Sequence, residues 1–285
     1  MLVNPVSLYK KARKHGFAIG AFNTSNAEIT KAIIKTAERL GSPVIIETSE
    51  NEMAHVGSEV MVAEITAIAK NTKIPVALHL DHGKSFESVR EAIRAGYSSV
   101  HIDGSTLAFE ENFKLTKAVV DLAHNNKVAV EGEVGHIEGN SSEHKLPFEI
   151  KKENLTDPGD AAFFVKKTKV DILAISIGNI HGLYETTPML DFDRLEEISK
   201  SVKLPFSLHG GSGIPKNQIQ KAIAFGITKI NVNTEIRVAF KRGLLHEFDL
   251  RPDEVVPYKY LPAGSAAVEK VVESKIKIFG SAGQA

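Results

Sequence analysis

Short runs of apolar, often β-branched residues alternate along the chain with longer segments of helical spacing. The runs are almost continuously apolar, which is typical of parallel strands covered on both faces. The segment 26–41 shows the helical type, with apolar residues recurring from Ile29 onward and Gly41 at its end. Eight runs are expected to form strands: 17–22, 43–48, 75–80, 98–103, 128–134, 171–177, 205–210 and 227–233.

These strand–helix units predict an α/β fold, a closed (β/α)8 TIM barrel that takes up residues 1–285 as one domain. A doubly wound open sheet is the alternative. It would carry a glycine-rich nucleotide fingerprint after an early strand, and the sequence has none there. The polar connection 135–156 suits a mobile active-site loop or a solvated insertion equally. The segment 252–285 is expected to add a C-terminal helix that packs on the barrel or on a partner subunit.

The amino-acid composition mainly excludes certain kinds of site and partner. Cysteine is absent, which excludes disulfides, thiolate metal sites and cysteine nucleophiles. The formal net charge is zero, so no field attracts nucleic acid or an anionic membrane, and any anion site must be local. The first residues lack the apolar core of a signal peptide, and no apolar stretch approaches ~20 residues. A cytoplasmic location is expected.

Polar and ionisable residues gather where the predicted strands end. In a (β/α)8 barrel the carboxyl ends of the strands meet at one face, and that face carries the chemistry. Scattered polar residues of a protein core would not sort in this way. The residues found at these ends, glycines included, are Asn23, Ser49, Asp81, His82, Asp103, Ser105, Glu131, Glu133, His181, Gly182, His209, Gly210, Gly211, Ser212, Asn231, Asn233 and Thr234.

Three of these strand ends carry a histidine that is followed by glycine: His82, His181 and His209. A lone histidine of this kind is usually a hydrogen-bonded structural residue. Three in equivalent positions favour a catalytic zinc site, because three neutral imidazoles leave one coordination position open to water or substrate. Asp81 precedes the first of them and is the natural proton shuttle, unless it caps a helix or supports a ligand. Asp103 and Glu133 could orient the histidines or bind a second cation.

The other histidines carry weaker signals. His79 and His101 lie within predicted strands and are expected to pack or hydrogen-bond there. His136 and His144 fall in the long connection, where either a structural or a functional role fits. The remaining ones are expected at the surface: His15, His55, His124 and His246.

The stretch HGGSG (209–213) indicates a phosphate site. Its glycines bare backbone N–H groups, Ser212 adds a hydroxyl, and a helix expected to start near Pro215 would contribute its positive end. With NVNT (231–234) on the next strand, this matches the place where (β/α)8 enzymes often bind phosphate. A metal beside such a cradle implies a phosphorylated substrate whose carbonyl the metal polarises.

At this point the chain resembles the class II, zinc-dependent ketose-bisphosphate aldolases, which include fructose- and tagatose-bisphosphate aldolases. The matching stretches, in order, are AIGAFN, LHLDHGKS, VHIDGS, VEGEVG, IGNIHGLY, LHGGSGIP, INVNTEIR and KIFGSAG. The resemblance implies a homodimer or homotetramer. It also implies reversible cleavage of a ketose 1,6-bisphosphate, through a metal-stabilised enediolate, to dihydroxyacetone phosphate and an aldehyde, glyceraldehyde 3-phosphate.

Carried over by position, the resemblance implies that His82, His181 and His209 bind the catalytic Zn²⁺. Asp81 would exchange the proton of the C4 hydroxyl, and Glu133 matches a glutamate beside the zinc. A Na⁺ or K⁺ ion is expected near the triose phosphate, and a second divalent ion is allowed. The substrate-binding positions are, for the distal end, Asn23 and Ser49, and for the dihydroxyacetone phosphate, Gly182, Gly210, Gly211, Ser212, Asn231, Asn233 and Thr234.

The chain departs from the family pattern at two places. In the family, the loop after the fifth strand reads like G-G-x-E-D-G, and its glutamate removes the proton from dihydroxyacetone phosphate. Here that place falls on Ser141, with Glu138 and Glu143 nearby, and Glu143 is the expected base. No basic residue is assigned to a distal phosphate. A ketose 1-phosphate with a sulfonated or deoxy sugar acid end therefore stays open as a substrate.

Two rival functions have specific signatures. A metal-dependent hydrolase on this barrel usually begins with H-x-H on the first strand and ends with an aspartate on the eighth, but this chain has GAFN and NVNT there. A non-catalytic sugar-phosphate binding protein would tolerate the altered loop, yet it would not need three metal histidines together with Asp81. An aldolase is the favoured function.

Overall fold

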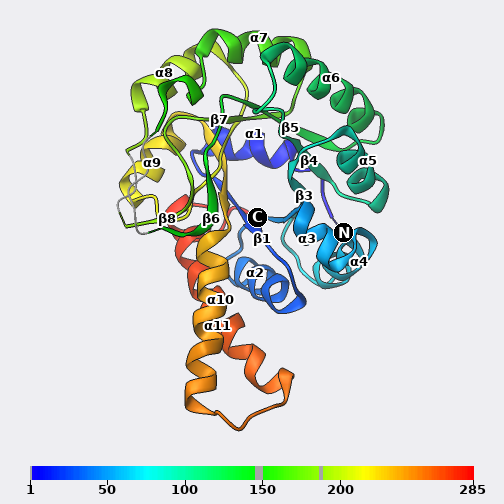
Figure 1. The fold of residues 1–285 in the computed structure, drawn as a ribbon, viewed down its shortest axis with the longest axis vertical. Coiled ribbons are helices and arrows are strands. Elements are labelled where there is room, and N and C mark those ends of the chain that lie inside the picture. Colours follow the sequence, from blue (N-terminus) through cyan, green and yellow to red (C-terminus); the bar gives the residue numbers. More distant parts are fainter. Residues whose placement is uncertain (1, 145–149, 186–188) are drawn as a thin grey trace.

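The computed structural model describes residues 2–144, 150–185 and 189–285. Within these residues, eight parallel strands close into a barrel with helices around it, which confirms the predicted (β/α)8 fold (Figure 1). Hydrogen bonds join each strand to its two neighbours around the barrel. In barrel order the strands are β1 (Ile19–Asn23), β10 (Ile227–Val232), β9 (Phe206–Leu208), β7 (Ile172–Ile175), β5 (Ala129–Val134), β4 (Ser99–Ile102), β3 (Val76–Gly83) and β2 (Val44–Ser49).

The two faces of each strand have different partners. Outward-facing residues such as Ile46, Leu78 and Ile230 pack against the surrounding helices in the main apolar core. A second apolar cluster fills the amino-terminal end of the barrel, where α1 (Val6–His15) packs Tyr9 against the strands. Figure 1 shows α1 lying across that opening. Toward the other end of the barrel the inward-facing positions become polar. Apolar outward positions and polar inward positions therefore alternate along the strands, although the sequence runs look almost continuously apolar.

The helices begin and end where local sequence allows. Asn26 caps its helix by accepting a hydrogen bond from the backbone N–H of Ile29, and Ser85 forms a capping box with Ser88. Gly96, in a left-handed backbone conformation, ends the helix that Ser85 begins. The helices of the outer layer are α2 (Ala27–Arg39), α3 (Glu50–Val56), α4 (Ser58–Ala69), α5 (Phe86–Ala95), α6 (Phe109–Asn125), α7 (Pro158–Thr168), α8 (Phe192–Ser201) and α9 (Lys216–Ala224).

The long connection 135–156 contains more regular structure than its polar composition indicates. Its residues Gly139–His144 form β6, which pairs in parallel with β8 (His181–Tyr184) in a separate two-stranded sheet. A 3-10 turn, η1, follows at Lys152–Asn154. Residues 145–149 lie outside the described part of the chain. A strand forms here because β8 supplies backbone hydrogen-bond partners that the local sequence does not reveal.

The carboxyl-terminal segment forms a helical hairpin that projects from the barrel (Figure 1). It consists of α10 (Thr234–Leu250) and α11 (Pro257–Phe279), so the added helix predicted for 252–285 is present. The two helices approach closely because Gly243 and Gly264 face the partner helix: an added Cβ at Gly243 would lie 2.7 Å from the Ala263 carbonyl oxygen. Helix α11 also packs on α2. Among the described residues, no helix is long and apolar enough to cross a membrane.

Candidate active site

A cavity of about 500 Å³ opens at the carboxyl ends of the barrel strands. Most of the residues proposed from sequence line it, although they come from segments far apart in the chain. Of the proposed site residues, Glu133, Gly211 and Glu143 do not belong to its wall. Those that do are Asn23, Ser49, Asp81, His82, Asp103, His181, Gly182, His209, Gly210, Ser212, Asn231, Asn233 and Thr234.

A local irregularity of β3 places His82 in the cavity. The register between β3 and β4 shifts between Leu80 and Gly83, and His82 has a left-handed backbone with φ of 51°. Such a conformation is costly for a residue with a Cβ, and bulges of this kind often re-aim side chains beside functional sites. An added Cβ at Gly83 would lie 2.8 Å from the carbonyl oxygen of His101, so glycine is needed directly after His82.

His181 reaches the cavity differently from the prediction. The sixth barrel strand ends at Ile175, and His181 is the first residue of β8 rather than the end of a barrel strand. The turn between them contains Gly178, with φ of +95°, and Asn179, whose side chain donates to the His209 carbonyl oxygen at 3.1 Å. His181 therefore lies on a small two-stranded sheet, and the turn before it is hydrogen-bonded to the barrel.

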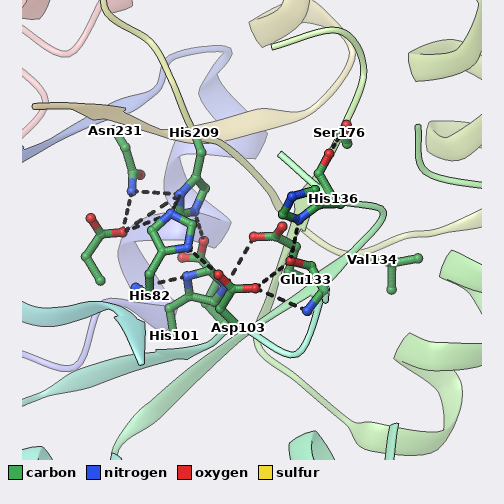
Figure 2. Close-up of polar contacts among 12 residues, drawn as sticks. His82, His101, Asp103, Glu133, Val134, His136, Ser176, His209 and Asn231 are labelled. Carbon is green, nitrogen blue, oxygen red and sulfur yellow. Dashed lines mark hydrogen bonds and ion pairs between the residues drawn. The ribbon is translucent and has the colours of Figure 1, made fainter. Parts of the chain in front are cut away.

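The three imidazoles converge around His82 (Figure 2 shows His82 and His209). Nε2 of His82 lies 3.2 Å from Nε2 of His181 and 2.9 Å from Nδ1 of His209. Nitrogens bound to one tetrahedral Zn²⁺ at ~2.0–2.1 Å would be separated by roughly 3.3–3.4 Å. Both separations are close to that value, whereas the His181 and His209 rings lie further apart, with their centroids at 6.0 Å. His82 therefore lies between the other two rings, and the residues whose ligand atoms all lie within 4.8 Å of one another are Asp81, His82, His101 and His209.

Each imidazole ring also has a hydrogen-bond partner outside the group of three, as metal-bound histidines usually do. Nδ1 of His82 contacts Asp103 Oδ2 at 2.8 Å, and Nε2 of His209 contacts Glu131 Oε1 at 2.6 Å. The His181 ring is hydrogen-bonded by the backbone of Ile137. Each outer contact fixes the ring orientation and leaves the facing nitrogen for a metal.

The charges around these rings favour a cation. Burial lowers the pKa of His209 well below its usual value, and burial with the nearby His82 lowers that of His181 to about 4, so both rings are neutral. Burial also opposes a charge on His82, but Asp81 and Asp103 outweigh it and raise the pKa of His82 to about 10. Acidic surroundings that hold a proton on His82 would equally stabilise a metal ion there, with release of the proton.

Asp81 lies beside the imidazoles and is held by two amides. Its Oδ1 is 3.8 Å from both His82 Nε2 and His209 Nδ1. The side chains of Asn231 and Asn23 donate to its carboxylate at 3.1 and 3.0 Å. Although burial raises it, the charge of His82, together with that of Lys229 and the hydrogen bond from Asn23, brings the pKa of Asp81 well below its usual range. The carboxylate is therefore ionised, fixed in direction and able to accept a proton.

The predicted phosphate cradle is built mainly from backbone. Gly210 has φ of +65°, and an added Cβ there would lie 2.0 Å from the Ile180 carbonyl oxygen, so only glycine fits. Asn233, Thr234 and Ser212 complete this wall, and the buried Oδ1 of Asn233 has no hydrogen-bond partner among the described residues. The helix that begins at the cavity is α10. Helix α9 begins at Lys216, next to the predicted start near Pro215, and contributes none of the residues that line the cavity in the described chain.

The proposed catalytic glutamate lies elsewhere. Glu143 on β6 pairs with Arg242 of α10 at 2.5 Å, and 55 % of its side chain is exposed. Neither Glu143 nor Glu138 lines the cavity, whereas Ser141 does. Formation of β6 explains the difference, because the strand turns the Glu143 carboxylate toward α10.

Several functional candidates were missed by sequence reasoning. Arg237 and Lys84 line the cavity and supply the positive charges that the sequence analysis did not find. A signal existed: Lys84 directly follows the HLDHG stretch, and Arg237 lies one helical turn after Thr234, inside the quoted INVNTEIR. His136 also lines the cavity.

A buried ion network supports the site from inside the barrel. Nζ of Lys229 lies 2.7 Å from Glu47 and 2.9 Å from Glu131, and all three side chains are fully buried. Lys229 also donates to Asn231 Oδ1 at 2.8 Å. Because Glu131 contacts His209 and Asn231 contacts Asp81, the lysine stabilises partners of both a metal ligand and the proton acceptor. The sequence held a signal for this network, because Lys229 and Asn231 are two residues apart on β10 and their side chains therefore point to the same face of the strand.

Comparison with known proteins gives the family of the chain. The family model for class II fructose-bisphosphate aldolase matches residues 3–284. A sulfofructosephosphate aldolase from Alkalicoccus urumqiensis is 41% identical over 98% of this chain and 96% of its own length. A fructose-bisphosphate aldolase from Thermus caldophilus is 40% identical, with both chains fully covered.

Solved structures give the same result. The YdjI aldolase from Escherichia coli K12 is 34% identical over the full length of both chains, with a TM-score of 0.87. A putative fructose-1,6-bisphosphate aldolase from Coccidioides immitis is 28% identical over 99% of this chain and 97% of its own, also with a TM-score of 0.87. Since both the family model and the relatives span the whole chain, this protein belongs to the class II fructose-bisphosphate aldolase family.

Proposed function

We propose that this aldolase reversibly cleaves a ketose 1,6-bisphosphate, fructose or tagatose, to dihydroxyacetone phosphate and glyceraldehyde 3-phosphate. One observation carries the proposal. In the cavity, Nε2 of His82 lies 3.2 Å from a nitrogen of His181 and 2.9 Å from a nitrogen of His209, and the Asp81 carboxylate lies 3.8 Å from the nitrogens of His82 and His209. The backbone cradle at Gly210 and Asn233 shares that cavity and supports a phosphorylated substrate.

The donor set fits the zinc on which the family depends. His82, His181 and His209 would hold it, and three nitrogen ligands leave a position open. When bound, the ion supplies Lewis acidity toward the substrate carbonyl. His82, Asp103 and Glu133 form a further group with metal-ligand spacing, beside the group of Asp81, His82, His101 and His209, and would be the place of a second divalent ion. A Na⁺ or K⁺ ion would sit near the triose phosphate.

Asp81 is the proton acceptor for cleavage. The Asn23 and Asn231 amides hold its two oxygens, so the carboxylate does not need to reorganise when the C4 hydroxyl approaches. It takes the hydroxyl proton as the C3–C4 bond breaks, and returns that proton to the aldehyde oxygen in the condensation direction. General acid–base help of this kind contributes roughly 10²–10⁴-fold.

The other side of the cavity supports a substrate with an anionic distal end. Arg237 donates to Glu52 at 2.7 Å, and 44 % of its side chain stays exposed at the cavity wall. Ser49 lies on the same side, with its N–H and hydroxyl donating to Glu52. Arg237 and Lys84 suit a phosphate, and they suit a sulfonate equally. The second candidate substrate is therefore a ketose 1-phosphate with a sulfonated end, in line with the sulfofructosephosphate aldolase among the relatives.

We also propose that the chain works in the cytoplasm as a homo-oligomer, a dimer or a tetramer. The α10–α11 hairpin supports association, because apolar side chains near its tip are exposed: Leu245, Leu250, Val255 and Tyr258. The zero net charge gives no reason to expect nucleic acid or membrane as a partner.

The test is a screen of ketose phosphates with a coupled assay for released dihydroxyacetone phosphate. Fructose and tagatose bisphosphates, sulfofructose 1-phosphate and fructose 1-phosphate form the panel, and zinc content is measured in the same preparation. The proposal predicts EDTA-sensitive cleavage that Zn²⁺ restores, fastest for substrates with an anionic distal end. Metal-free protein, or metal-loaded protein that binds these sugars without cleaving them, would point to the non-catalytic binding protein instead.

A further inference from the structure

We propose that His136 is the base that removes the proton from the hydroxymethyl carbon of bound dihydroxyacetone phosphate, the role that the family pattern gives to a loop glutamate. The inference rests on the proposed function, because it concerns one half of the same reaction. It is carried by a chain of contacts from Asp103 through Ser105 to the His136 ring, at the wall of the active-site cavity (Figure 2 labels Asp103 and His136).

The backbone of His136 is fixed on both sides. Its N–H donates to the Asn154 carbonyl oxygen at 2.8 Å, and its own carbonyl oxygen accepts from Ser176 Oγ at 3.1 Å. Gly135 before it has φ of +83°, where an added Cβ would lie 2.8 Å from the Asn154 oxygen. Residue 136 thus has a set position at the end of β5, whereas Glu138 and Glu143 belong to the polar segment beyond it.

The contacts also select the tautomer of the ring. Ser105 Oγ lies 2.6 Å from Asp103 Oδ1 and 3.0 Å from His136 Nδ1. An ionised carboxylate only accepts hydrogen bonds, so the single hydroxyl hydrogen of Ser105 points at Asp103. Nδ1 of His136 must then carry a hydrogen and donate to Ser105. This leaves a lone pair on Nε2, which has no hydrogen-bond partner within 2–144, 150–185 and 189–285.

Asp103 links this ring to the metal histidines. One of its oxygens contacts Ser105 and the other contacts Nδ1 of His82 at 2.8 Å. The two imidazoles are therefore oriented by the two oxygens of one half-buried carboxylate. This arrangement, in which a carboxylate orients a base through a hydrogen bond, is the one that activates histidine in other enzymes, here with a hydroxyl interposed.

The other groups at the cavity are less suited to the role. Asp81 is committed to the hydroxyl proton, and Ser141, at the place of the family glutamate, is too weakly basic. Glu50 lines the cavity on the distal side, where its Oε1 accepts the Lys84 backbone N–H at 2.8 Å. Glu143 is paired with Arg242 on α10.

The step balances as a proton transfer. In the condensation direction Nε2 of His136 takes the proton, the C–H electron pair becomes the carbon–carbon double bond of the enolised triose phosphate, and the carbonyl π pair moves onto oxygen. In the cleavage direction the protonated His136 returns the proton to the same carbon after the aldehyde has formed. Asp81 handles only the oxygen-bound proton, so the two residues act on different atoms.

The experiment compares His136→Asn with the wild type as zinc-loaded enzymes. Asparagine can keep a donor toward Ser105 but has no basic nitrogen in the Nε2 position. Exchange of the dihydroxyacetone phosphate hydrogen with D₂O is followed by proton NMR and is expected to fall roughly 10²–10⁴-fold, with zinc content unchanged. His124→Asn, an exposed histidine paired with Asp171, is the matched control and should exchange at the wild-type rate.

A second readout separates catalysis from structure. During cleavage of fructose bisphosphate, ferricyanide oxidises the enolised triose phosphate before it is protonated. In His136→Asn its consumption should rise relative to release of dihydroxyacetone phosphate, a ratio that a merely loosened loop would not change. Wild-type exchange in His136→Asn, or loss of exchange in Glu143→Gln alone, would overturn the assignment. If the wild type itself neither exchanges nor cleaves, the failure lies with the proposed function.

Discussion

The two sides of the cavity are built differently. The side with the imidazoles and Asp81 is anchored in the barrel: Asp81 and Asn231 lie on barrel strands, and His209 follows one directly. These three side chains are almost completely buried and hydrogen-bonded. The opposite side is built by helix starts and connections, with Arg237 on α10 and Lys84 before α5, and its cations remain partly exposed.

This difference suggests a division of work. Buried strand positions hold groups in fixed geometry, which general acid–base chemistry and metal binding require. Exposed positions on helices and connections change more readily without disturbing the core, and they are suited to recognising the variable end of a substrate. Substitutions on the imidazole side should therefore lower activity toward every substrate, and substitutions on the opposite side should lower it mainly for substrates with an anionic end.

The largest effect is expected from His209→Ala. Two imidazoles hold zinc poorly, and loss of this ring also leaves Glu131 without its partner at 2.6 Å. Zinc content by mass spectrometry and cleavage by coupled assay should fall together to background for every substrate. His124→Ala serves as the surface control. Retained zinc with full turnover would remove His209 from the ligand set.

Asp81→Asn is expected to come next. The side chain stays nearly isosteric, so zinc binding should persist, while loss of the proton acceptor lowers kcat roughly 10²–10⁴-fold. The fall should be similar for fructose bisphosphate and fructose 1-phosphate, because the C4 hydroxyl is common to both. A change confined to KM would mean that Asp81 only positions the substrate.

Arg237→Ala should have a smaller and more selective effect. Loss of one hydrogen-bonded charge pair costs ~1.5–3 kcal/mol, so kcat/KM for substrates with an anionic end should fall roughly 10- to 100-fold, mainly through KM. Fructose 1-phosphate, with a neutral end, should change little. Arg251→Ala, at the far end of α10, is the control. Equal losses for both substrates would show that the two sides of the cavity are not separable.

Ser49→Ala is expected to be the mildest change. Ser49 caps α3 and its hydroxyl donates to Glu52, which in turn holds Arg237. Loss of a cap costs ~1 kcal/mol of stability, measurable as a small decrease in Tm. Activity toward bisphosphates should fall only severalfold. A loss as large as that of Asp81→Asn would place Ser49 in the chemistry rather than in recognition.

The fold was predictable because outward strand residues such as Ile46 and Leu78 must meet helices and are therefore apolar. Eight such apolar runs, alternating with helical segments, predicted the barrel. In a barrel of parallel strands the polar residues at the strand ends lie at one face. Most of the candidate site followed from that alignment alone, including Asp81 and His209. Strand ends were placed less well: β7 stops at Ile175, two residues before the predicted end.

What sequence could not supply depends on contacts between distant segments. The polar residues of β6 form a strand only because β8 lies beside them, so the direction of Glu143 could not be anticipated. The contact of Glu131 with His209 depends on how neighbouring strands are staggered around the barrel. The orientation of His136 requires Asp103 and Ser105 to meet it in space, although all three residues were visible in the sequence.

The most direct test of the account is a crystal structure of protein purified without chelator, with anomalous diffraction recorded on both sides of the zinc absorption edge. The account predicts one strong peak in the cavity, bound by Nε2 of His82, Nε2 of His181 and Nδ1 of His209, within ~2.0–2.1 Å of each nitrogen. A metal-replete crystal without that peak, or with a peak that these three nitrogens do not share, would contradict it.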